Sequence, residues 1–338
     1  MKINPSEIRK ILCIKPRGIG DIVLSTIILD NLTAHFPSAD IHYLVEQFAK
    51  DSVSNNPMIK KINTMQKSEL VFSVATRLIK EKYDLILDLW SNPRSAQITF
   101  LTFAKYRVGF AYRGRKYAYN ILAEAGRGET HSTEHNLELL KAIEVPLISN
   151  SIYYFTGEVE KIFANNFFNK TFTTDEPVIG IIPSGGWESK RCDAVKWVDI
   201  CSTLWAHFNY KFLILWGPGD ENDATFIKTK LGNRCVLAPT SSVAELSALI
   251  EKCIIIIAND SGPMHISAAL QVPTLGIFGP TNPKAHRPFS QNSDYIIKED
   301  LHCIICNKLV CPYKHECMIE LDENIIVKKV EDLLNEKD

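Results

Sequence analysis

The chain has 338 residues, a length that suits two domains better than one. Hydrophobic residues make up 46% and charged residues 23%, a composition typical of soluble globular proteins that excludes a largely disordered chain. The net charge of −1 argues against a general nucleic-acid binder, so we expect no nucleic-acid partner.

The first ten residues carry no signal-peptide pattern, and no apolar run is long enough to cross a bilayer. We therefore expect a cytoplasmic protein that touches a membrane at most from its surface. Five cysteines are scattered along the chain, and we expect them to be small core residues in a reducing compartment.

Strands alternate with amphipathic helices along the N-terminal part of the chain. The pattern predicts strands at 11–15, 41–45, 84–90 and 107–110, and helices at 21–35, 69–82 and 134–143. We assign residues 1–150 to a first Rossmann-like domain.

Residues 151–176 show no strong strand pattern and form the expected interdomain connection, with a helix at 158–168. The alternation then restarts, with strands at 178–182, 212–216, 254–258 and 274–278 and helices at 193–207, 221–231, 243–250 and 263–270. We assign 177–320 to a second Rossmann-like domain and 321–338 to a C-terminal helix. The whole predicts an α/β protein whose two mostly parallel sheets face a central cleft.

Asp21 stands out in the turn between the first strand and the first helix. The glycines of this turn, Gly18 and Gly20, lack the third glycine of a dinucleotide fingerprint, which argues against a nicotinamide-dependent oxidoreductase. Asp21 either caps its helix or, at the carboxyl end of the sheet, acts as a general base.

Three Gly- and Pro-containing loops follow strands of the second domain. The first contains Gly185 and Gly186, which permit close backbone approach to a ligand, and Lys190, which suits a phosphate or else is a solvated surface lysine. Glu221 in the second loop either accepts from ribose hydroxyls or complements a helix dipole.

The third loop joins a buried strand to a helix start. Its candidate residues are Asp260, Ser261, Gly262 and His265, where free backbone amides and the helix dipole favour an anion and His265 could donate to a phosphate oxygen. The alternative is an ordinary strand-to-helix turn with Asp260 or Ser261 as its N-cap.

Four cysteines cluster near the C-terminus: Cys303, Cys306, Cys311 and Cys317. Their spacing could place four thiolates around one structural zinc ion, with iron as the second choice, and reduced thiols packed in a loop as the alternative. They lie on a different loop from the nucleotide-binding candidates, so we expect them to affect that site only indirectly.

Several segments along the chain together resemble one known family. They are residues 14–21, 84–88, 185–190, 216–221, 259–265 and 278–281. They resemble glycosyltransferase family nine, the ADP-heptose:lipopolysaccharide heptosyltransferases. The resemblance implies a GT-B fold, with Asp21 as the catalytic base, Lys190 and the Asp260–His265 turn on the donor diphosphate, and Glu221 on the ribose.

The implied reaction is an inverting transfer of heptose from ADP-heptose to a lipopolysaccharide core-type acceptor. No D-x-D motif occurs, so we expect no metal or other cofactor in catalysis. The alternatives are another nucleotide-sugar, a non-lipid acceptor, or a non-catalytic nucleotide-sugar binding protein.

A basic stretch without Asp or Glu between Asp88 and Glu124 fits an anionic acceptor and peripheral contact with the inner membrane surface, or is a solvated face. The candidate acceptor-binding residues are Arg17, Arg94, Arg113 and Arg115.

Overall fold

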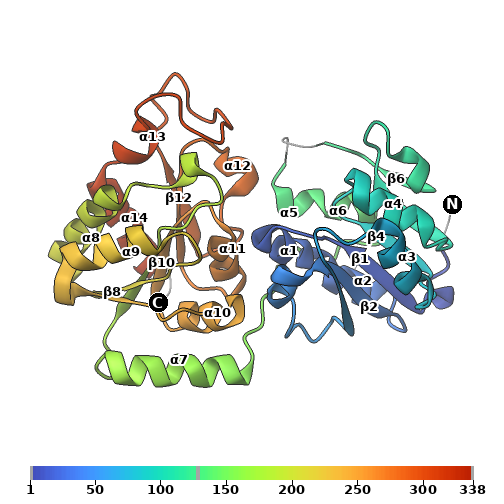
Figure 1. The fold of residues 1–338 in the computed structure, drawn as a ribbon, viewed down its shortest axis with the longest axis horizontal. Coiled ribbons are helices and arrows are strands. Elements are labelled where there is room, and N and C mark those ends of the chain that lie inside the picture. Colours follow the sequence, from blue (N-terminus) through green and yellow to red (C-terminus); the bar gives the residue numbers. More distant parts are fainter. Residues whose placement is uncertain (1–2, 127–129, 336–338) are drawn as a thin grey trace. The chain divides into compact units, whose positions relative to one another are not determined.

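The computed structural model of the protein describes residues 3–126 and 130–335. The chain divides into two compact units, Met1–Phe155 and Thr156–Asp338, which we call the N-terminal and C-terminal units (Figure 1). Each unit contains one six-stranded parallel sheet covered by helices on both faces. The two units are described separately.

The N-terminal sheet has the strand order β3-β2-β1-β4-β5-β6, the doubly wound Rossmann order. Its strands are β1 (Lys10–Ile14), β2 (Asp40–Glu46), β3 (Lys61–Met65), β4 (Leu85–Asp88), β5 (Tyr106–Phe110) and β6 (Ile121–Ala123). Every neighbouring pair is parallel, so all six strands end at the same edge of the sheet.

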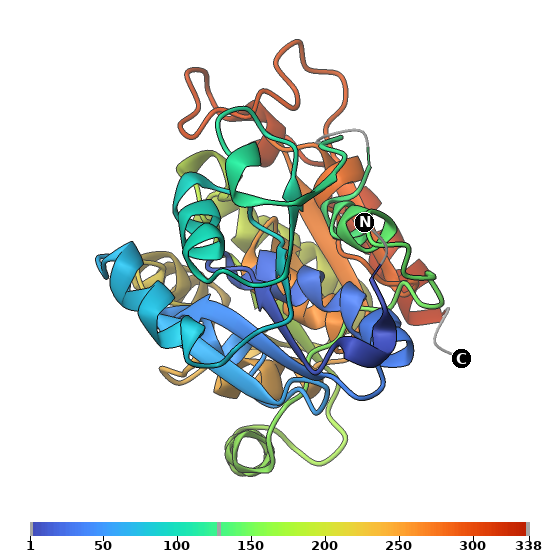
Figure 2. The same cartoon turned by 90° about the vertical axis from the view of Figure 1, so that its right-hand side faces the viewer.

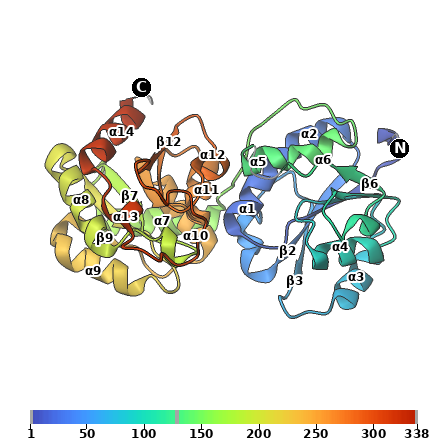
Figure 3. The same ribbon diagram turned by 90° about the horizontal axis from the view of Figure 1, so that it is seen from above.

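The helices of this unit lie in two layers (Figure 3). α3 (Val71–Ile79) and α4 (Pro93–Leu101) cover one face, and α1 (Ile19–Leu24), α2 (Leu29–His35), α5 (Ser132–His135) and α6 (Leu137–Lys141) cover the other. Leu12 and Ile14 of β1 pack into the core beneath α3 and α4. Because strand side chains alternate between faces, Ile11, Cys13 and the next residue in register, Lys15, point toward the other layer.

Four short 3₁₀ helices complete the N-terminal unit: Pro5–Glu7, Ser25–Ile28, Gln47–Ser52 and Lys116–Ala118. The second of them interrupts the helix that the sequence predicts at 21–35. The hydroxyls of Ser25 and Thr26 each donate at 2.6 Å to a carbonyl three residues earlier, which favours the tighter turn over a continuous α-helix.

The C-terminal sheet has the order β12-β11-β10-β7-β8-β9, which is the same topology repeated. Its strands are β7 (Val178–Ile182), β8 (Lys211–Ile214), β9 (Cys235–Leu237), β10 (Ile255–Asn259), β11 (Thr274–Phe278) and β12 (Ser293–Ile297), all parallel. The three strands β7, β10 and β11 are buried along their whole length.

The main core of this unit lies between the sheet and α8 (Ala194–Phe208), α9 (Glu221–Leu231) and α14 (Glu323–Asn335). The opposite face carries α10 (Val243–Glu251), α11 (Gly262–Ala269) and α12 (Pro283–His286) (Figure 3). The remaining helices are α7 (Glu158–Thr171), α13 (Glu316–Ile319) and the 3₁₀ turns Glu188–Lys190 and Gly232–Arg234. Residues 336–338 of the predicted C-terminal helix lie outside the described residues.

Within the described ranges, no helix combines the length and the apolar character needed to span a membrane. The expected GT-B class, with two Rossmann-like α/β domains, is confirmed by these two sheets.

Candidate active site

In both sheets the strand order reverses at a defined point, and open α/β sheets bind ligands at such a point. The switch lies between β1 and β4 in the N-terminal unit and between β7 and β10 in the C-terminal unit. The loops that leave the carboxyl ends of these strands carry most of the residues that the sequence singles out.

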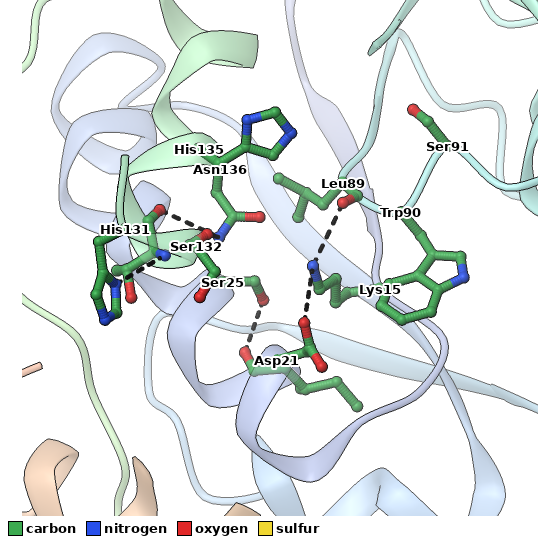
Figure 4. Close-up of polar contacts among 12 residues, drawn as sticks. Lys15, Asp21, Ser25, Leu89, Trp90, Ser91, His131, Ser132, His135 and Asn136 are labelled. Carbon is green, nitrogen blue, oxygen red and sulfur yellow. Dashed lines mark hydrogen bonds and ion pairs between the residues drawn. The ribbon is translucent and has the colours of Figure 1, made fainter. Parts of the chain in front are cut away.

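Asp21 lies in the first turn of α1, the helix that follows β1 in the chain (Figure 4). The N-cap position of this helix belongs to Gly18, so Asp21 is not the cap. Gly18 has a φ of 83°, and a Cβ built on it would lie 2.4 Å from Asp21 Oδ2. Glycine is therefore needed here both for the backbone conformation and for room around the carboxylate.

Lys15 is the cation beside this carboxylate, and sequence reasoning missed it. Its side chain is 8% exposed, and its Nζ lies 3.7 Å from Asp21 Oδ1 and 3.4 Å from the carbonyl oxygen of Leu89 (Figure 4). The ammonium also lies 5.0 Å from the ring centroid of Trp90. Asp21 itself remains 47% exposed, so the ion pair orients a carboxylate that solvent can reach.

Asp88 holds the loop that supplies Leu89 and Trp90. This fully buried carboxylate accepts hydrogen bonds from the amides of Trp90 at 3.2 Å and Ser91 at 2.8 Å, and from the Tyr119 hydroxyl at 2.7 Å. Burial raises the pKa of Asp88, and these hydrogen bonds only partly oppose that effect. Asp88 therefore shapes the site without being open to substrate.

Two of the four candidate acceptor arginines line a cavity of about 190 Å³ at the edge of the N-terminal sheet. Arg17 pairs with Glu46 through two contacts of 3.2 and 3.1 Å. Arg94 donates to three backbone carbonyls, those of Gln66, Lys67 and Glu69, at 2.5–2.9 Å. Arg94 thus organises the wall of the cavity, and most of its donors are already used.

Arg113 and Arg115 line a second, more open cavity of about 490 Å³ together with Lys116. Arg115 donates to the carbonyl of Ser91 at 3.1 Å, whereas Arg113 is exposed. The four predicted acceptor residues therefore fall into two separate cavities of the same unit, and Arg113 is the one that is exposed.

The C-terminal unit brings Lys190 and Asp260 together from the loops after β7 and β10. Lys190 Nζ lies 2.7 Å from Asp260 Oδ2, and both side chains are largely buried. The Thr281 hydroxyl donates to the same carboxylate oxygen at 2.6 Å. Burial alone would raise the pKa of Asp260, but the charge and hydrogen bond of Lys190, with the Thr281 bond, hold it below its usual range.

Asn259 ties these two loops to each other. Its Nδ2 donates to the carbonyl of Pro183 at 2.7 Å, and its Oδ1 accepts from the amide of Cys192 at 3.4 Å. The Lys190 ammonium also lies 4.4 Å from the ring centroid of Trp187. The result is a fixed cation at the switch point of the second sheet.

The start of α11 adds hydrogen-bond donors beside this cation. Ser261 occupies the N-cap position, but its side chain forms no capping bond. Among the described residues, its buried Oγ has no hydrogen-bond partner. Gly262 opens the helix, and its first-turn amides are free by geometry except at Pro263, which has no N–H; His265 in the same turn is 6% exposed. An anion at this point would satisfy the Ser261 hydroxyl and the helix amides together.

Glu221 is exposed as the first residue of α9, while its neighbour Asp220 is buried in a polar network. Asp220 pairs with Arg191 at 2.9 Å, accepts from Ser184 Oγ at 2.5 Å and accepts from the Gly217 amide at 3.2 Å. Sequence reasoning missed this network, although Asp220 stands next to Glu221. It connects the first and second loops and leaves Glu221 free to meet a ligand.

The two glycines of the first loop differ in their surroundings. A Cβ on Gly185 would lie 2.9 Å from Arg191 Cγ, whereas a Cβ on Gly186 would meet nothing within 4 Å. Gly185 therefore permits the approach of Arg191, and Gly186 leaves open space beside the loop.

The cysteine cluster is not arranged as a metal-ligand set in this structure. In the described part of the chain, no group of three or more Cys, His, Asp or Glu side chains is placed to hold a metal ion. All four thiols are partly exposed and free of disulfides. Burial, together with the proximity of the other three cysteines, raises the pKa of Cys317 to about 12. The cysteines are neighbours, but the residues as placed do not fit the predicted zinc or iron.

Two Rossmann-like domains with a fixed cation and helix amides at the second switch point define a GT-B protein with a candidate phosphate site. The sequence model of glycosyltransferase family 9 (heptosyltransferase) matches residues 71–316. The chain belongs to this family and is a glycosyltransferase.

Relatives and solved structures agree with this assignment along nearly the whole chain. Lipooligosaccharide heptosyltransferase 2 of Haemophilus influenzae is 23% identical over 344 residues, covering 96% of this chain and 99% of the relative. The fold is similar to a family 9 glycosyl transferase from Veillonella parvula (TM-score 0.86, 20% identity, 97% of each chain). It is also similar to E. coli ADP-heptose lps heptosyltransferase II (TM-score 0.80, 21% identity, 97% and 99% covered).

Of two further structural neighbours, one was solved with a nucleotide-sugar analogue and the other contains iron. A heptosyltransferase of E. coli was solved with ADP-2-deoxy-2-fluoro heptose (TM-score 0.71, 15% identity, 96% and 99% covered). An iron-containing dodecameric glycosyltransferase of enterotoxigenic E. coli covers this chain fully (TM-score 0.60, 12% identity, 78% of that chain).

Proposed function

We propose that this enzyme transfers heptose from ADP-heptose to a lipopolysaccharide core-type acceptor, with inversion at the anomeric carbon. The observation that carries the proposal is the buried Lys190–Asp260 pair beside the start of α11, where the Ser261 hydroxyl has no partner in the described structure. This combination suits the diphosphate of a nucleotide-sugar. The names of the relatives support heptose and lipopolysaccharide as the sugar and the acceptor class.

Asp21 is the general base of the proposed reaction. Its carboxylate takes the proton of the acceptor hydroxyl as the hydroxyl oxygen attacks the anomeric carbon, and the bond from that carbon to the diphosphate oxygen breaks. Attack from the face opposite the leaving group inverts the configuration. Lys15 orients the carboxylate from its buried side through the 3.7 Å ion pair.

The departing ADP gains negative charge, which Lys190 and the amides at the start of α11 offset. Asp260 fixes Lys190 at the site, and Glu221 is proposed to accept from the ribose hydroxyls. Since these groups supply the needed charge and no D-x-D motif is present, we propose a transfer that needs no metal at the diphosphate.

The acceptor is proposed to meet the basic side chains of the N-terminal unit. Arg17 and Arg113 offer the more accessible charges of the two cavities, and Arg115 and Arg94 shape their walls. Carboxylates and phosphates of a core-type acceptor complement these charges. We also propose a cytoplasmic location with the basic face toward the anionic inner membrane surface.

The test combines product identification with substitution of Lys190. Mass spectrometry of reactions with ADP-heptose and a panel of truncated core acceptors should show addition of one heptose. Lys190→Ala should weaken both ADP binding and turnover, by about tenfold or more, because a charge-assisted contact is worth roughly 1.5–3 kcal/mol. Lys170→Ala, in α7, is the matched control and should behave like the parent. Parental ADP affinity in Lys190→Ala would remove this loop from the phosphate site.

A further inference from the structure

The cysteine segment, residues 301–318, contacts the loop that carries Lys190 and the loop after β11, whose Thr281 donates to Asp260. Figure 2 shows it as the long orange-red excursion of the chain between β12 and α13. The sequence places these cysteines on a loop of their own, apart from the nucleotide-binding residues. In the fold, the segment returns to the carboxyl edge of the sheet and packs against the first loop and the loop after β11.

Ser189, the residue before Lys190, has all of its polar groups bonded to this segment. Its amide donates to the carbonyl of Leu309 at 3.2 Å, and its hydroxyl donates to the carbonyl of Lys308 at 2.5 Å. Its carbonyl accepts from His315 Nε2 at 2.8 Å. Ser189 is 2% exposed, so these bonds are shielded from bulk solvent.

The same segment holds the loop after β11. The amide of Ile305 donates to the carbonyl of Gly279 at 3.3 Å, and the amide of Asn307 donates to the carbonyl of Pro280 at 2.8 Å. A Cβ on Gly279 would lie 2.7 Å from Cys317 Sγ, so the two pieces of chain are in close contact. The next residue, Thr281, donates to Asp260. One segment therefore reaches both members of the ion pair through their neighbours.

The Lys190 loop needs such support because it has little structure of its own. Its only regular element is a single 3₁₀ turn, Glu188–Lys190, and Trp187 at the N-cap position provides no side-chain capping bond. A turn of this length is not stable by itself. Gly185 and Gly186 just before it add backbone freedom. External hydrogen bonds must therefore set the position from which the long Lys190 side chain meets a phosphate.

We propose that the cysteine segment is a positioning element for the nucleoside-diphosphate site, with Ser189 and His315 as positioning residues that hold Lys190 in place. This inference rests on the proposed role of Lys190 at the donor diphosphate. It assigns to residues 301–318 an effect on nucleotide affinity that does not depend on any metal bound there. Preorganising a cation in this way strengthens binding because less freedom is lost when the ligand arrives.

The experiment measures ADP affinity calorimetrically for Ser189→Ala and His315→Ala in the full-length chain. Loss of one such hydrogen bond should weaken ADP binding by about three- to tenfold and raise the donor KM similarly. His302→Ala is the matched control, since His302 lies in the same segment and is exposed. Its ring centroid lies 5.1 Å from that of Tyr313. His315→Gln, which keeps a side-chain donor, should recover most of the affinity.

A double-mutant cycle with Lys190→Ala separates positioning from general packing. If Ser189 acts through Lys190, Ser189→Ala should have little further effect on ADP affinity once Lys190 is gone. Parental affinity in both Ser189→Ala and His315→Ala, with Lys190→Ala still impaired, would overturn the positioning role and leave the proposed function intact. Full additivity with Lys190→Ala would also overturn it. Parental affinity in Lys190→Ala would instead refute the proposed phosphate contact.

Should His315→Ala fail to fold, hydrogen exchange on the parent chain provides a second measurement. Binding of ADP should then slow amide exchange in the peptide that covers 301–318, because coupling between two sites is reciprocal. Unchanged exchange at saturating ADP would contradict the proposal.

Discussion

At the scale of single residues, the proposed reaction divides between two carboxylates with opposite surroundings. Asp21 is half-exposed and accompanied by Lys15, so it suits proton transfer with a substrate hydroxyl. Asp260 is buried against Lys190 and Thr281, so it suits holding a cation in place. Environment, and not residue type, assigns the two roles.

Asp21→Ala should abolish transfer while ADP affinity stays within a few-fold of the parent. Loss of a general base typically costs about 10²–10⁴ in rate, and Asp21 lies in the unit without the proposed donor residues. Transfer kinetics and calorimetry with ADP check the two halves of this prediction. Near-normal turnover of the purified variant would remove Asp21 from the mechanism.

Asp88 carries a prediction about pH and stability. Because burial raises its pKa in the folded chain, the folded state holds this proton at pH values where the unfolded chain has lost it. The contribution of Asp88 to the free energy of unfolding therefore falls as the pH rises above about 4, where a carboxyl of the unfolded chain titrates. An amide at this position can still accept from the Trp90 and Ser91 amides but does not titrate.

The melting temperature of Asp88→Asn, measured relative to that of the parent, should accordingly be higher at pH 7 than at pH 4. Asp175→Asn, at an exposed position with φ of 63°, provides the control for the same change of side chain on the surface. A pH-independent difference for Asp88→Asn would contradict the assigned sign.

At the scale of elements, the strands that sequence patterns missed are β3, β6, β9 and β12. These four are the edge strands of the two sheets. β3 and β12 are only partly buried, and β6 and β9 have three residues each, so none carries a long apolar run. Central strands such as β7 and β10 are buried on both faces and are recognisable from their composition alone.

The cysteine segment is the element whose described residues do not match the predicted metal site, because its thiols lie near one another without forming a ligand set. If the segment does bind an ion, protein purified without a histidine tag should contain roughly one zinc or iron per chain, and Cys306→Ser should lower metal content and melting temperature together. Four titratable thiols in metal-free protein, with stability unchanged by a chelator, would leave the cluster as ordinary packing.

At the scale of the whole molecule, one topology occurs twice, and each copy has its own sheet and core. All proposed donor residues belong to the C-terminal unit, whereas Asp21 and the basic acceptor residues belong to the N-terminal unit. Binding of the nucleotide and activation of the acceptor are thus assigned to different units.

Residues 156–338 expressed alone should fold and bind ADP within about tenfold of the full-length affinity, but should not transfer heptose. Circular dichroism and calorimetry test the first part, because the core of this unit is formed by its own helices and sheet. Folded protein with no measurable ADP binding would show that the donor site needs residues of the N-terminal unit.

The sequence by itself determined the features that depend on local pattern. Apolar periodicity identified the central strands and most helices, and glycines placed the Asp21 and Lys190 loops at the ends of strands. Only the tertiary structure decided which distant residues meet: Lys190 with Asp260, Lys15 with the Leu89 carbonyl, and Ser189 with the cysteine segment. Such contacts depend on strand order and loop packing, which bring together residues about 70 or more positions apart that no local pattern relates.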